Sequence, residues 1–198
     1  LLGGSKGDLL DGGDGIDRIE QTVDLEQVLT DTLVTGRGAD TLSSIEEAVL
    51  IGGPQGTNIN AEAFTGNVTL IGNGGNDTLI AGSGNDLLDG GDGNDKLFGL
   101  GGNDTADGAA GNDSVIGGNG NDVLLGGSGN DTIRGEAGDD TLLGEAGDDT
   151  VDGGSGNNTV TGGGNSESVS AGDAVTVGDA GTIDNALMFD FDSLIASI

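Results

Sequence analysis

Nine aspartates recur at intervals of nine residues in the middle of the chain, and each follows a glycine-rich stretch such as GGSGN. Carboxylates are hard oxygen donors, and divalent cations such as Ca²⁺ and Mg²⁺ prefer donors of this kind. The chain has no Cys and no His, so thiolate and imidazole metal sites are excluded within it, as is Ser-His or Cys-His catalysis. The nine residues are Asp77, Asp86, Asp95, Asp104, Asp113, Asp122, Asp131, Asp140 and Asp149.

The charge of the whole chain also indicates a cation as partner. It has 35 acidic and 5 basic residues, a formal net charge of -30, and a compact fold with that charge repels itself unless cations neutralise it. The scarcity of Lys and Arg excludes nucleic acid and anionic membranes as natural partners. No apolar run is long enough for a transmembrane segment.

The aspartates belong to a repeat of eleven nine-residue units that begins at Gly72. The first and fourth positions are Gly with few exceptions, among them Ala81, and the eighth position is aliphatic in every unit. The sixth position is Asp in nine units, then Asn158 and Glu167. Glycines permit positive φ, so positions one to six predict a turn. Positions seven to nine predict a short strand whose central side chain stacks with its counterparts into a narrow core.

These units resemble GGxGxDxUx, the calcium-binding nonapeptide of the RTX family (hemolysin-type repeats). The resemblance covers residues 72 to about 164, and two further units lie between Gly3 and Glu20, with Asp8 and Asp17 in the sixth position. The first of these has Lys6 where the fourth-position Gly belongs. The resemblance implies an all-β fold, a right-handed parallel β-roll or β-solenoid with calcium bound in the turns and a short C-terminal cap.

In the family fold two units make one turn of the roll, which implies two columns of stacked aspartates. Asp77 to Asp149 would form one column of five, and Asp86 to Asp140 the other column of four. By resemblance, each Asp bridges the calcium ions above and below it, and turn carbonyls complete each shell. We expect about seven Ca²⁺ ions in the main block, with Asn158 closing a weaker site beside Asp140. Mg²⁺ is the lesser candidate because it demands stricter octahedral geometry.

Two simpler interpretations compete with calcium binding. An isolated Gly-Asn-Asp is usually only a turn whose Asp bonds its own backbone, but nine copies in strict register favour metal binding. Disorder suits a chain with high charge and few aromatic residues, and we expect it for the calcium-free state. Ion binding would then supply the free energy of folding.

The chain divides into four segments by its pattern. Residues 1–20 are a short repeat block, 21–71 an irregular β-solenoid, 72–170 the main β-roll, and 171–198 a C-terminal cap and type I secretion signal. In the irregular segment, Asp40 occupies a degenerate ligand position, residues 66–71 predict a strand, and a separate small domain is the alternative. After the repeats, residues 168–183 predict one or two strands, and then Leu187, Phe191 and Leu194 begin a helical face.

The first functional hypothesis is a calcium-binding module that folds outside the cell and supports type I secretion of a larger protein. It implies a secreted or cell-surface location and contact of the C-terminus with type I secretion machinery. The alternative is a structural stalk of an adhesin, surface layer or extracellular filament. We predict no enzymatic activity: GGSGN at 126–130 only superficially resembles a nucleophile elbow, and any catalytic domain would lie upstream of Leu1.

Overall fold

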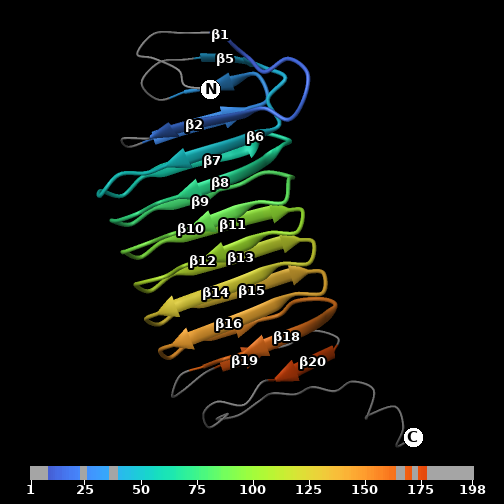
Figure 1. The fold of residues 1–198 in the computed structure, drawn as a ribbon. Helices are drawn as coiled ribbons and strands as arrows, with labels where there is room; N and C mark the ends of the chain where they lie inside the picture. The colour runs from blue at the N-terminus through green and yellow to red at the C-terminus, as the bar shows by residue number, and fades with distance from the viewer. Residues whose placement is uncertain (1–8, 23–25, 36–39, 164–167, 171–173, 178–198) are drawn as a thin grey trace, which may run out of the picture.

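The chain winds as a parallel β-solenoid of about six turns, passing alternately through two sheets (Figure 1). The structure, a computed structural model, describes residues 9–22, 26–35, 40–163, 168–170 and 174–177. Within these ranges there is no helix, and hence none that could cross a membrane. The expected all-β solenoid is therefore confirmed.

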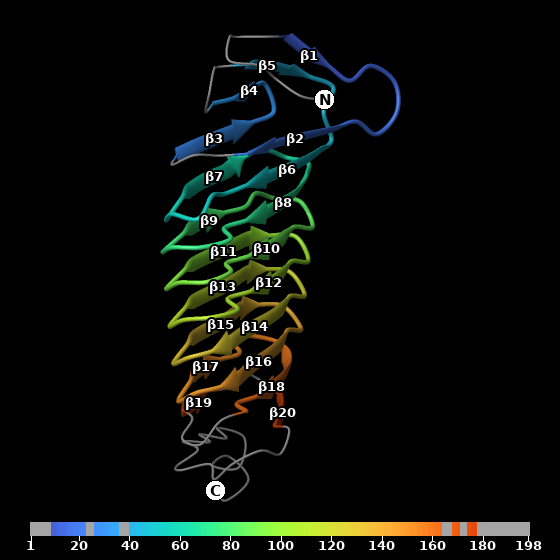
Figure 2. The same ribbon diagram turned by 60° about the vertical axis from the view of Figure 1, so that its left-hand side comes forward.

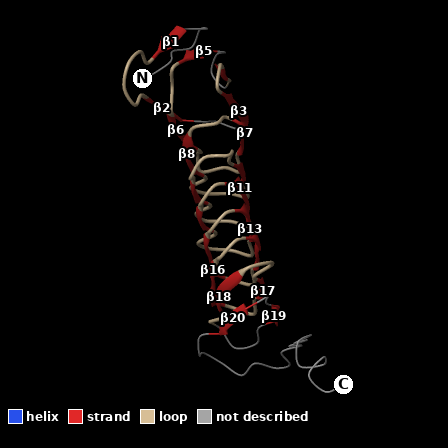
Figure 3. Ribbon diagram, turned by 90° about the vertical axis from the view of Figure 1, so that its right-hand side faces the viewer, coloured by secondary structure: helices blue, strands red, loops and turns tan. Residues whose placement is uncertain are grey.

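The odd-numbered strands together with β4 form one sheet of eleven strands, called sheet A here, and the other even-numbered strands form one of nine, sheet B. The two sheets run side by side along a narrow rod, and turns connect one sheet to the other (Figures 2 and 3). In the order of their pairing, the strands of sheet A are β1 (Leu9–Asp11), β5 (Asp40–Ser43), β4 (Leu33–Val34), β3 (Glu26–Thr30), β7 (Asn58–Ala63), β9 (Thr78–Ile80), β11 (Lys96–Gly101), β13 (Ser114–Asn119), β15 (Thr132–Ala137), β17 (Thr150–Asp152) and β19 (Ser168–Ser170). The strands of sheet B are β2 (Arg18–Thr22), β6 (Glu47–Ile51), β8 (Asn67–Ile71), β10 (Leu87–Asp89), β12 (Thr105–Asp107), β14 (Val123–Ser128), β16 (Thr141–Ala146), β18 (Asn157–Thr161) and β20 (Ala174–Val177).

The register of the strands places two repeat units in each turn of the solenoid. In sheet A, Leu79 pairs with Leu97 and Leu97 with Val115. Because the eighth-position side chains of both sheets point inward, they stack into two continuous columns, and each is at most 1% exposed. In the main block, each repeat unit thus contributes one aliphatic side chain from its strand to the core. Its members are Leu79, Leu88, Leu97, Ala106, Val115, Leu124, Ile133, Leu142, Val151 and Val160.

Several strands are longer than the repeat pattern predicts. Strands β11 and β13 to β16 extend over the first three positions of the next unit, which the repeat pattern assigns to the turn. The register of β11 with β13 passes from Phe98↔Ile116 to Leu100↔Gly118, without a pair at the first-position Gly99. Neighbouring coils thus also bond to each other at positions two and three, while the first-position glycine is left out of the ladder.

The coils before the main block continue the same two sheets with less regular turns. Strand β8 confirms the strand predicted for residues 66–71, and strands β3, β4 and β5 pair antiparallel, unlike the rest of the rod. Phe64 is 1% exposed and fills the turn between β7 and β8. At the other end, β19 and β20 confirm the strands predicted after the repeats. The predicted helical face at 187–198 and the signal it was to form lie outside the described residues.

Candidate metal-binding turns

The sixth-position residues lie at the two rims of the rod, where each turn enters the next strand. All nine aspartates of the main block and Asn158 are buried, with exposed fractions of 1 to 4%. Because strands one coil apart pair in register, the carboxylates form two columns. The first contains Asp77, Asp95, Asp113, Asp131 and Asp149, and the second contains Asp86, Asp104, Asp122 and Asp140, followed by Asn158.

One carboxylate oxygen of each aspartate bonds to the backbone of the preceding coil. The N–H of Asp77 donates to Oδ1 of Asp95 at 2.7 Å, and the N–H of Asp95 donates to Oδ1 of Asp113 at 2.7 Å. The same bond recurs along both columns, ending with the N–H of Asp140 and Oδ1 of Asn158 at 2.9 Å. This ladder fixes the orientation of the nine aspartates of the main block and of Asn158.

The second carboxylate oxygen has no such bond in most of the repeats. In the described part of the chain, Oδ2 is buried without a hydrogen-bond partner in Asp77, Asp95, Asp104, Asp113, Asp122, Asp131 and Asp140. A buried carboxylate oxygen without a donor is costly, because water no longer solvates it. Because the same buried oxygen recurs without a donor in successive turns, its repetition is what we expect of a cation site at the same place in each turn.

This unpartnered Oδ2 lies beside the first-position glycine of its own turn, next to a backbone carbonyl oxygen of the following coil. A β-carbon added to Gly108 would lie 2.7 Å from Oδ2 of Asp113 and 2.6 Å from the carbonyl oxygen of Gly126. At Gly126 the corresponding distances, to Asp131 Oδ2 and the Gly144 carbonyl, are 2.5 and 2.8 Å. A side chain at this position would displace these atoms, so glycine is what lets the carboxylate and the carbonyl, both oxygens of a type that Ca²⁺ accepts, come together here. We call this place, where the two oxygens meet beside the glycine, the cradle of a turn; Gly72, Gly90, Gly99, Gly135 and Gly144 border others.

Glycine is also required at the fourth position of the turn. Gly111 has a φ of 139°, and a β-carbon there would overlap the carbonyl oxygen of Gly93 in the coil before it. The same overlap recurs from Gly93 to Gly147 along both columns. Stacked turns therefore approach each other through backbone alone, which keeps the carboxylates and carbonyls of adjacent coils close together.

The metal-free turns favour protonated carboxyl groups. Burial raises the pKa of Asp104 and of Asp113 to about 7 from an ordinary 3.8, although a backbone N–H donor opposes the rise. The charges of neighbouring aspartates raise it further; for Asp104 these are Asp86 and Asp122. Burial also raises the pKa of Asp77, to about 6, and in the same direction those of Asp86, Asp95, Asp122, Asp131 and Asp140. A bound proton or cation would offset both the burial and the mutual repulsion of these carboxylates.

No group of three or more acidic side chains able to hold a metal ion occurs among the residues that the structure describes. Each cradle combines one carboxylate oxygen with a backbone carbonyl, so a metal shell here draws on the backbone as well as on Asp. Ca²⁺ accepts this mixture of carboxylate and carbonyl ligands. Such a site does not stand out as a cluster of acidic side chains.

Sequence reasoning missed a second ladder, formed by the fifth-position residues. The N–H of Asn94 donates to Oδ1 of Asn76 at 2.9 Å, and the N–H of Asn112 donates to Oδ1 of Asn94 at 2.8 Å. It runs opposite to the aspartate ladder, because its side chains reach toward the following coil. The Asn that directly precedes most of these aspartates was the signal in the sequence that could have revealed this ladder. Its other side-chain acceptors are Asn67, Asn85, Asn103, Asn112, Asn121, Asn130 and Asp139.

A turn near the N-terminus shares features with the main block. Gly13 and Gly15 both have positive φ, and Oδ2 of Asp17 is buried without a partner in the described residues. The N–H of Asp17 donates to a carboxylate oxygen of Glu46 at 2.9 Å, so Glu46 takes the place of the next aspartate of a column. The sequence did not indicate Glu46, because a long irregular coil separates it from Asp17. Asp8 lies outside the described residues, as does the side chain of Asp40.

Comparison with known proteins gave one family. The RTX calcium-binding nonapeptide repeat, described in blocks of four copies, matches residues 29–44 and, in overlapping blocks, residues 65–167. These matches cover more than half of the chain and do not include residues 1–28. No curated protein and no solved structure matched the chain significantly.

Proposed function

Because the chain belongs to the family of RTX calcium-binding nonapeptide repeats, we propose that Ca²⁺ occupies the cradles between its stacked turns and drives the solenoid to fold. The family match makes this a calcium-binding β-solenoid module. The observation that carries the finer proposal is the buried and unpartnered Oδ2 repeated in successive turns.

The ligands follow from the geometry of the cradles. Oδ2 of a sixth-position Asp and the first-position carbonyl of the next coil supply oxygens, as Asp113 and Gly126 illustrate. Bound calcium would supply positive charge that offsets both burial and mutual repulsion of the carboxylates. The chain's own contribution is the pair of ladders, which hold the carboxylates in place, and the glycines, which leave room for the ion.

The N-terminal turn is the candidate for a separate site. Asp17 offers an unpartnered carboxylate oxygen, and Glu46 a second carboxylate in the stacked coil. In the main block, Asn158 lies at the end of its column with Oδ1 bonded to Asp140 and Nδ2 3.4 Å from the carbonyl of Gly154. Its amide therefore presents a donor where the aspartates present an acceptor. We propose Asn158 as a weak calcium ligand at the end of the column.

Folding that depends on calcium fits export of an unfolded chain. RTX repeats are typical of type I secreted extracellular proteins, and we infer the same route for the protein that contains this module. Low calcium inside the cell would leave the net charge of -30 uncompensated, and higher calcium outside would fold the repeats. Deleting residues 171–198 should abolish export through a type I channel while leaving calcium binding intact. Export that survives the deletion would place the signal elsewhere.

Circular dichroism in the far ultraviolet tests the folding proposal. After treatment with EDTA, the chain should show little β structure and should gain it cooperatively as CaCl₂ is added. MgCl₂ at equal concentration is the matched control and should not restore the β signal. A β-rich spectrum already present in EDTA, with no response to calcium, would show that the cradles do not hold the fold together.

A further inference from the structure

Ala81 is the one first-position residue between Gly72 and Gly162 that carries a side chain. It is fully buried. At the neighbouring units, a β-carbon in this position would press against the carboxylate of its own turn, as at Gly90, where it would lie 2.5 Å from Oδ2 of Asp95. The methyl group of Ala81 is therefore incompatible with the close approach of the carboxylate to this position that the other turns show.

The carboxylate of Asp86, in the same turn, is turned away from that position. Its Oδ1 accepts the N–H of Val68 at 2.7 Å, as the ladder requires, but its Oδ2 accepts the N–H of Gly82 at 3.1 Å. Both oxygens of Asp86 thus have donors within the protein. Asp95, by contrast, has its Oδ2 buried without a partner in the described part of the chain.

The backbone of this turn also differs from that of its neighbours. In the next turn the second and fourth residues, Gly91 and Gly93, have φ values of 93° and 139°. In the turn of Ala81, neither Gly82 nor Gly84 has a positive φ. The turn therefore presents its carbonyl groups in another arrangement, although it has the same glycines.

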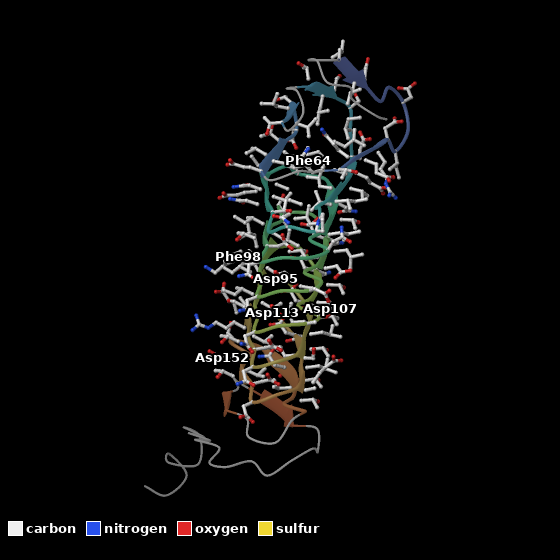
Figure 4. All side chains as sticks on the ribbon, turned by 90° about the vertical axis from the view of Figure 1, so that its left-hand side faces the viewer. Phe64, Asp95, Phe98, Asp107, Asp113 and Asp152 are labelled. Carbon is white, nitrogen blue, oxygen red and sulfur yellow. The ribbon has the colours of Figure 1, made fainter. Side chains whose placement is uncertain are left out.

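The coil before this turn explains the difference. It has Val68 at the sixth position instead of Asp, and Phe64 fills its interior (Figure 4). A β-carbon on Gly82 would press against the carbonyl oxygen of Phe64, so Gly82 packs directly on that turn. The end of this column thus stacks on an apolar coil that offers no carboxylate.

From these contacts we infer that the turn 81–86 is closed to calcium and that the second column of ions begins at Asp104. This inference rests on the proposed function and refines it. The gap between Asp86 and Asp104 then holds no ion, while the first column begins one coil earlier, at Asp77. Ala81 closes the cradle, and Asp86 acts as a hydrogen-bond acceptor that fixes the turn.

Calcium stoichiometry tests the inference. We would measure bound calcium per chain by equilibrium dialysis at saturating CaCl₂, with circular dichroism to verify that each variant is folded. Asp86→Asn should leave the number of bound ions unchanged, whereas Asp104→Asn, the matched control one coil later, should lower it by at least one. An equal loss in both variants would overturn the inference.

A gain-of-site variant gives an independent result. Ala81→Gly removes the methyl group and should raise the number of bound ions by one. A folded Ala81→Gly chain with an unchanged number would overturn the role of Ala81. A wild-type chain that binds no calcium at all would instead contradict the proposed function, so the two failures are distinguishable.

Discussion

The two oxygens of a sixth-position carboxylate have different surroundings. We propose that the first holds the backbone of the adjacent coil and that the second binds calcium. Oδ1 of Asp113 holds the N–H of Asp95 at 2.7 Å, while its Oδ2 is buried and faces the cradle at Gly108. Asn can replace the first oxygen, as Asn158 does for Asp140, but it places an amide nitrogen where the second oxygen belongs. The ladder itself therefore does not require Asp, and we propose that the ion does.

Asp95→Asn should weaken calcium binding without breaking the ladder. The variant keeps an acceptor for the N–H of Asp77 but loses the charged oxygen in the cradle, so the calcium concentration at the folding midpoint should rise at least about tenfold. Asp92→Asn is the matched control, since Asp92 is exposed in the same turn and its loss changes the net charge equally. Equal midpoints in the two variants, measured by calcium-titrated circular dichroism, would contradict the role given to Asp95.

The pH dependence of the metal-free chain follows from the raised pKa values. Asp104 and Asp113 have folded-state pKa values of about 7, above the ordinary 3.8, so the folded state binds more protons between these values. The free energy of unfolding without metal should then fall as pH rises from about 4 through 7. The EDTA-treated chain should show more β structure at pH 5.5 than at pH 7.5, both above its isoelectric point of about 4.1.

Calcium should remove that dependence. The unfolded chain and the calcium-loaded folded chain both have ionised carboxylates between pH 5.5 and pH 7.5, so the calcium concentration at the folding midpoint should be no higher at pH 5.5 than at pH 7.5. Less β structure at pH 5.5 than at pH 7.5 in EDTA would show that burial does not favour the protonated carboxyl groups as argued here.

At the scale of the element, the nine-residue unit combines a turn that we propose as the ion site with a strand that supplies the core. The repeat pattern predicted the strand at positions seven to nine, the inward eighth residue and the turn glycines, because each follows from local geometry. It did not predict the strand extension through Gly101 or the fifth-position ladder, since both depend on contacts between coils. The closed turn at Ala81 was also missed, because its shape depends on the irregular coil beneath it.

The second position of the turn is conformationally strained where it is not glycine. Glu136 has a φ of 72°, in the left-handed region that disfavours residues with a β-carbon. Glu136→Gly should raise the free energy of unfolding by about 1 kcal/mol in saturating calcium. Glu136→Gln is the control that removes the charge and keeps the strain. If the two variants are equally stable in urea denaturation, charge rather than backbone conformation accounts for the effect.

At the scale of the whole molecule, the described part of the chain is a stack in which each coil pairs with its neighbours. The N-terminal coils rest on Phe64 and other apolar side chains, and the main block rests on thin aliphatic columns together with the turns. The resemblance to the RTX family implied the two-column arrangement for the uniform repeats, but it could not place Glu46 beside Asp17 across an irregular segment. Regular coils are predictable from their period, whereas an insertion changes which residues meet.

Removal of one complete coil should preserve the fold. Deleting residues 108–125 takes out two units and restores the register of both sheets, so the chain should still fold with calcium. It should bind fewer ions and form a rod shorter by about 4.8 Å, one strand spacing, as measured by small-angle scattering. Deleting residues 108–121 breaks the period and should prevent cooperative folding. Equal behaviour of the two deletions would contradict the stacked-coil account.

The most direct test is to locate the ions in the calcium-loaded protein by anomalous diffraction. The account predicts peaks between stacked turns, beside the first-position glycines such as Gly90, Gly108 and Gly126, each within coordination distance of an aspartate Oδ2. It predicts none beside Ala81. An intact solenoid with no anomalous peaks in its turns at saturating calcium would contradict the claim that calcium joins one coil to the next.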